Sequence, residues 1–185
     1  EELFEKMDVH LKSRNKFSDY MTFEILFNLM SSASRSDLKV ELMQELEKQN
    51  IKVKQRRKSA NSKTLQNKIL RIKKILSKNV LQPGFYFGDD RLIQEIKTRR
   101  DSPFGILSTD FPEFKFWLES KNELKRKIYF QKKIEPFIAI KDATKLILNL
   151  LRKESVVQAA QTSDGHFQIK LNPLEKKDIV IVTLQ

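Results

Sequence analysis

Residues 61–79 read NSKTLQNKILRIKKILSKN, and this stretch determines how the rest of the chain is interpreted. Its apolar residues recur at helical spacing and form one stripe: Leu65, Ile69, Ile72 and Leu76. At 100° per residue, the residues that project roughly opposite this stripe are Lys63, Asn67, Arg71, Lys74 and Lys78. Leu70 also points outward, a position that favours a binding partner. The pattern predicts an amphipathic helix with an apolar back and a basic front.

The net charge of the chain is concentrated around this helix. The sequence carries 36 basic and 24 acidic residues, for a formal net charge of +12. No acidic residue occurs between Glu47 and Asp89, and twelve bases lie in that gap, so bases and acids balance elsewhere. Clustered charge creates a local field that recruits anions, whereas charge that serves solubility would be scattered. The segment from Lys48 to Gly88 is therefore predicted to bind a polyanion.

Composition limits the class of protein. A chain of 185 residues can form one generous domain or two small ones, and 39% hydrophobic residues with 13 Phe can build a core. Cysteine is absent, which excludes disulfide scaffolds, thiolate metal sites and Cys nucleophiles and fits a reducing compartment. No apolar run approaches the roughly 20 residues of a membrane helix. We expect a soluble, intracellular protein of the cytoplasm or nucleus, with no membrane partner.

The remaining pattern predicts a helix-rich α+β fold. Further helices are expected at 2–14, 21–31, about 34–49, about 112–128 and 142–153. Strands are expected at 51–54, within 80–87, and at 156–161, 166–171 and 179–184, where the turn Ser163-Asp164-Gly165 indicates a C-terminal antiparallel hairpin. Residues 91–99 fit a helix or a strand, and the Pro and Gly residues of 101–112 indicate a linker or a long loop.

Residues 20–88 resemble the winged-helix effector domains of bacterial two-component response regulators. Residues 21–26 (MTFEIL) are similar to the first effector helix, 62–76 (SKTLQNKILRIKKIL) to the recognition helix, and 81–87 (LQPGFYF) to the Gly-aromatic strand of the wing. The layout of the whole chain is similar to that of tandem winged-helix plasmid replication initiators. The resemblance implies a DNA-facing set of residues, namely Lys63, Asn67, Lys68, Arg71 and Lys74.

Three regions are expected on this basis. Residues 1–88 would form a basic winged-helix-like unit that binds nucleic acid, 89–111 a linker or long loop, and 112–185 a second α-then-β unit of unknown role. The predicted function is binding of duplex DNA in transcription regulation or replication initiation, with RNA left open as the ligand.

Each predicted site residue has an expected role at the nucleic acid. Asn67 and Arg71 would contact base edges, and Gln66 could assist. The residues expected to hold phosphates or the flanking backbone are Arg56, Arg57, Lys58, Lys63, Lys68, Lys74 and Lys78. No cofactor is expected.

Two other classes of function stay open. The chain could be a helical protein–protein interaction or scaffold domain of a larger protein, or a homodimer. It could also be a metal-dependent nuclease, because Asp89 or Asp90 with Glu95 and Lys97 resembles a D…ExK arrangement. No P-loop, GxGxxG motif or nucleophile motif is present in the sequence.

Overall fold

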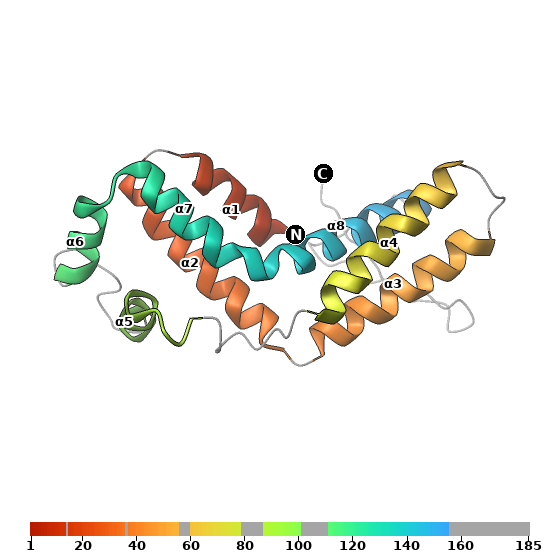
Figure 1. Ribbon diagram of the computed structural model, residues 1–185, viewed down its shortest axis with the longest axis horizontal. Helices are drawn as coiled ribbons and strands as arrows, with labels where there is room; N and C mark the ends of the chain where they lie inside the picture. The colour runs from red at the N-terminus through yellow and green to blue at the C-terminus, as the bar shows by residue number, and fades with distance from the viewer. Residues whose placement is uncertain (14, 36, 56–59, 79–86, 101–110, 156–185) are drawn as a thin grey trace, which may run out of the picture. The chain divides into compact units, whose positions relative to one another are not determined.

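The computed structural model describes residues 1–13, 15–35, 37–55, 60–78, 87–100 and 111–155. These residues form helices connected by turns (Figure 1). The helices are α1 (Glu2–Lys12), α2 (Lys16–Ala33), α3 (Leu38–Gln55), α4 (Ala60–Lys78), α5 (Arg91–Arg100), α6 (Pro112–Ser120), α7 (Glu123–Ile134), the 3₁₀ turn η1 (Glu135–Phe137) and α8 (Ile138–Glu154). The chain divides into two compact units, Glu1–Lys153 and Glu154–Gln185, and the helices lie in the first except for Glu154, the last residue of α8.

The predicted α+β fold class is wrong, because every regular element among the described residues is a helix. The predicted strand at 51–54 is the last part of α3. Val53 is 4% exposed and lies seven residues after Leu46, so it continues the buried helical stripe. Four alternating residues fit the repeat of a strand or of a helix. The longer apolar stripe of α3 decides that residues 51–54 are helical. The other predicted strands, at 80–86 and from 156 onward, lie outside the described residues, and so does the predicted loop at 101–110.

Several predicted helices are confirmed with shifted ends. The helix expected at 21–31 begins at Lys16, because Asn15 caps it by accepting a hydrogen bond from the Ser18 amide at 2.7 Å. The helix expected from 142 begins at Ile138, and Asp142, expected as its cap, lies inside α8. The undecided segment 91–99 is helical, as α5.

The single helix predicted at about 112–128 is two helices. Lys121 has extended backbone (φ −104°, ψ 128°), and the Asn122 side chain accepts a hydrogen bond from the Lys125 amide at 2.9 Å, which starts α7. The interruption resets the helical phase. Leu124, expected on the buried stripe of the predicted helix, is 65% exposed.

An aromatic cluster around Phe23 joins three helices. The centroid of the Phe23 ring in α2 lies 4.8 Å from the ring centroid of Phe130 in α7. It lies 5.6 Å from the ring centroids of Phe114 and Trp117 in α6, and all three pairs are edge-to-face. Edge-to-face pairs are worth about 0.5–1.5 kcal/mol beyond the burial of their area. Phe23 itself is fully buried. The cluster therefore fixes how α2, α6 and α7 pack.

Arg126 ties the same three helices together by polar contacts. Its guanidinium lies 2.6 Å from an Asp19 carboxylate oxygen in α2 and donates to the carbonyls of Leu118 and Lys121 at the end of α6. Burial raises the pKa of the Asp19 carboxyl, and the Arg126 guanidinium offsets only part of that rise. Such a pair adds little net stability but is costly to break, because either partner alone is a buried charge.

Helices α3 and α4 form an antiparallel pair. Lys39 near the start of α3 donates to the Ser77 carbonyl near the end of α4 at 3.4 Å, and Glu47 in the middle of α3 forms an ion pair with Lys73. Of the predicted inner stripe of α4, Ile69, Ile72 and Leu76 are buried, and Leu65 is partly buried against the core. Within the described ranges, no helix combines the length and the apolarity that a bilayer-spanning segment needs.

We predict that Arg126→Ala lowers the free energy of unfolding by about 3–5 kcal/mol, because it leaves Asp19 buried without its cation. Urea denaturation measures this change. Arg152→Ala is the matched control: Arg152 pairs with Glu1 on an exposed surface, so its loss should change stability little. Equal effects of the two substitutions would contradict the assigned role of Arg126.

Candidate functional site

Helix α4 contains basic but no acidic residues, and the orientation of its outer face follows from packing. Ile69, Ile72 and Leu76 of α4 are buried against the rest of the unit, so the opposite side of the helix is left to solvent. We call the α4 face the exposed residues on that side, namely Lys63, Asn67, Leu70, Arg71, Lys74 and Lys78, together with Lys68, which is exposed on the flank of the helix. All seven side chains are exposed.

The five cations of the α4 face form no ion pair with any carboxylate of the described residues. Ordinary surface helices pair Lys with Glu one turn away, which contributes a few tenths of a kcal/mol. Helix α4 contains no acidic residue to do so. Within the part of the chain that the structure describes, the positive charge of this face is therefore not neutralised by a carboxylate.

Two other cations of the acid-free segment 48–88 form ion pairs with carboxylates of α3. Lys73 forms an ion pair with Glu47 of α3, and Lys48 lies 3.5 Å from Glu45. The hydrogen bond from Lys73 lowers the pKa of Glu47. The acid-free segment is thus partly neutralised by the acidic first half of α3, which a count along the sequence could not reveal. Arg56, Arg57 and Lys58 lie outside the described residues.

Leu70 gives the α4 face an apolar centre. Its side chain is 46% exposed, and Lys63, Asn67 and Lys74 stand one or two turns away on the same side. Ile75, 41% exposed, lies beside this face. An exposed aliphatic residue surrounded by cations suits a ligand that carries both negative charge and an apolar group.

Two residues of the nuclease hypothesis, Asp90 and Glu95, are engaged in other contacts, and the other two, Asp89 and Lys97, are exposed. The Asp90 carboxylate forms an ion pair with Lys133 at 2.6 Å and accepts hydrogen bonds from the Tyr129 hydroxyl and the Ile93 amide. Glu95 pairs with Arg91 at 2.6 Å. Among the described residues, no group of three or more His, Asp or Glu side chains is placed to hold a metal ion. Asp90 caps α5 and connects it to α7, which is a structural role.

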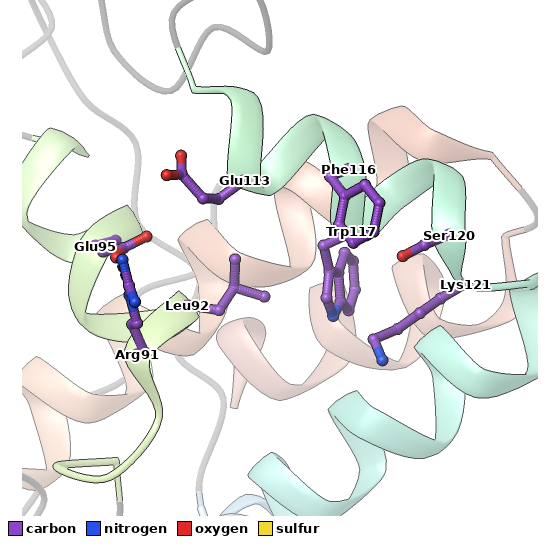
Figure 2. A pocket seen from close by; sticks show the side chains of 8 residues that line it. All are labelled: Arg91, Leu92, Glu95, Glu113, Phe116, Trp117, Ser120 and Lys121. Carbon is purple, nitrogen blue, oxygen red and sulfur yellow. Dashed lines mark hydrogen bonds and ion pairs between the residues drawn. The ribbon is translucent and has the colours of Figure 1, made fainter.

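A small cavity lies between α5 and α6 (Figure 2). Its volume is about 280 Å³, at the lower limit for a small-molecule site. Leu92 and Trp117 supply apolar walls, and the Arg91–Glu95 pair lies on its α5 side. Phe116 projects at its edge and is 71% exposed. Glu113, Ser120 and Lys121 also line the cavity, but no hydrogen bond or ion pair joins them, so we assign it no catalytic role.

The described residues thus define a helical protein with a basic, apolar-centred helix face. A family model described as "ZapD: Cell division protein" matches residues 1–185, and the chain belongs to this family.

Named relatives agree with the family assignment. A cell division protein ZapD of Nitrosomonas eutropha is 29% identical over 173 residues, covering 91% of this chain and 68% of that protein. The namesakes of Nitrosomonas europaea and Dechloromonas aromatica are 28% and 26% identical, and the match covers 66% and 69% of their lengths. The chain therefore spans about two thirds of these relatives.

The family assignment corrects the functional prediction. The resemblance to winged-helix effector domains and to plasmid replication initiators is wrong, and so is the prediction of DNA binding in transcription or replication. The packing explains the failure of the winged-helix resemblance: the presumed recognition helix pairs with α3, which runs through the position of the expected strand. The relatives are bacterial, so the nucleus, one of the two predicted compartments, is unsupported.

We predict that Asp90→Asn destabilises the protein most at neutral pH. Burial alone would raise the pKa of Asp90, but hydrogen bonds from Lys133, Ile93 and Tyr129 outweigh it and lower the pKa below its usual value of about 3.9. The ionised Asp90 carboxylate therefore stabilises the fold at pH values above the usual Asp pKa. This stabilisation is lost as the pH falls through the lowered pKa of Asp90. Urea unfolding at a series of pH values measures it.

The control for this experiment is Asp89→Asn, a substitution at the exposed neighbouring residue, which should follow the wild-type curve. A stability difference between Asp90→Asn and wild type that stays constant down to pH values below the usual Asp pKa would show that ionisation of Asp90 contributes nothing.

Proposed function

We propose that this chain acts in bacterial cell division as a helical protein-interaction module whose α4 face binds an acidic segment of another division protein. The family and the names of its relatives support the process. The observation that carries the mechanism is the set of five exposed cations on the helix of Leu70, which form no ion pair with any other described residue. The predicted alternative, a helical interaction domain of a larger protein, agrees with this proposal.

Charge and shape suggest which partner this face accepts. Unpaired cations speed association with an acidic partner and give the complex a strong dependence on salt. Leu70 would contact an apolar residue of the partner, which selects a peptide-like segment over a plain polyanion. Lys63, Arg71 and Lys74 would bind carboxylates, and Asn67 can donate and accept hydrogen bonds beside them.

We predict that the triple substitution Lys63→Glu, Arg71→Glu and Lys74→Glu weakens binding to the partner by about tenfold or more, because attraction becomes repulsion at the contact. Fold stability should barely change, since all three side chains are exposed and form no ion pair with another described residue. The measurement combines the localisation of a fluorescent fusion at the division site with titration against purified acidic division proteins of the same organism.

The matched control carries the same charge change scattered over three other helices, as Lys12→Glu, Lys97→Glu and Lys115→Glu, all exposed. This control should localise and bind like the wild type. An equal loss of localisation and binding in both variants would show that net charge, and not its position on α4, determines binding. A triple α4 variant that still localises and binds normally, or a wild-type chain that prefers duplex DNA to every division protein, would overturn the proposal.

A further inference from the structure

Helix α7 presents a second exposed face that combines cations with aliphatic side chains. Leu124 is 65% and Ile128 is 43% exposed, and their spacing of four residues places them in line on one side of the helix. The opposite side, which includes Arg126, Phe130 and Ile134, is buried. Helix α7 therefore carries apolar side chains on its exposed side as well as on its buried side.

Three lysines flank this pair. At 100° per residue, Lys127 lies on one side of the Leu124–Ile128 line, and Lys125 and Lys132 lie on the other. All three are exposed and have no ion-pair partner among the described residues, unlike Lys133, which is bound to Asp90. Gln131 completes the surface between them. We call these six residues the α7 face: Leu124, Lys125, Lys127, Ile128, Gln131 and Lys132.

We propose that the α7 face is a second docking surface, separate from the α4 face, and that its occupant is an acidic amphipathic helix of a protein partner. Leu124 and Ile128 form a ridge with the spacing of one helical turn, which fits the groove of another helix. Carboxylates on both flanks of that helix would meet Lys127 on one side and Lys125 and Lys132 on the other. The complementarity of charge selects an acidic partner.

An anionic membrane surface is the competing occupant, and the composition of the face disfavours it. Interfacial helices insert a broad apolar face that typically contains Trp, Phe and Leu. The α7 face offers two aliphatic side chains and no aromatic one. Its apolar area is a narrow line between cations, which suits a helix-on-helix contact.

The absence of cysteine makes a site-specific test possible. Gln131→Cys places a single thiol in the α7 face, where an environment-sensitive fluorophore reports contact at this helix alone. Because the probe reports on α7, binding at the α4 face does not produce the signal. The ligand is a synthetic amphipathic peptide with Leu along one stripe and Glu on both flanks.

The labelled protein should bind this peptide, and Lys127→Glu with Lys132→Glu should weaken the response about tenfold, as two exposed attractions become repulsions. Leu124→Ser should weaken it as well, with an unchanged circular-dichroism spectrum. The control Lys97→Glu with Lys115→Glu carries the same charge change away from α7 and should leave the affinity unchanged.

Three results would overturn the proposal. These are a wild-type signal that does not respond to the acidic peptide, a response that Lys127→Glu with Lys132→Glu leaves intact, and a response to phosphatidylglycerol vesicles that exceeds the response to the peptide. The last result would assign the face to a membrane surface.

Discussion

The apolar stripe of α4 determines where its cations lie. Burial of Ile69, Ile72 and Leu76 is worth roughly 1.5–3 kcal/mol per side chain, far more than any exposed ion pair can contribute. The helix therefore cannot rotate to bring its outer lysines to the carboxylates of α3. Only Lys73, at the margin of the buried stripe, reaches Glu47. The basic surface is thus a consequence of core packing.

The rest of the first unit is organised by contacts between residues far apart in the sequence. Phe23 meets Phe114, Trp117 and Phe130, and Arg126 binds Asp19, 107 residues away. These contacts hold α7 with its inner side buried and its Leu124–Ile128 line exposed. The two basic helix faces therefore depend on packing in different parts of the unit, which is why separate substitutions can test them.

The sequence predicted helices where a periodic stripe was long, as for α2, α4 and α8, and it predicted which side of α4 is buried. It failed where a short pattern was ambiguous: 51–54 alternates like a strand but continues the stripe of α3 through Val53. The α7 face was missed because one uncapped helix was assumed across Lys121 and Asn122. The clustered charge indicated an anionic ligand but did not specify its class, and the family match, not a feature of the sequence pattern, showed that DNA was the wrong choice.

The account rests on the claim that neighbouring lysines of α4 differ in their access to solvent. Chemical acetylation followed by mass spectrometry measures this residue by residue on the folded chain. Lys63, Lys68, Lys74 and Lys78 should be modified rapidly, and Lys73, whose side chain is 21% exposed and paired with Glu47, should react slowly. Equal rates at Lys73 and Lys74, or protection of Lys63 and Lys74, would contradict the orientation on which the proposed binding surface depends.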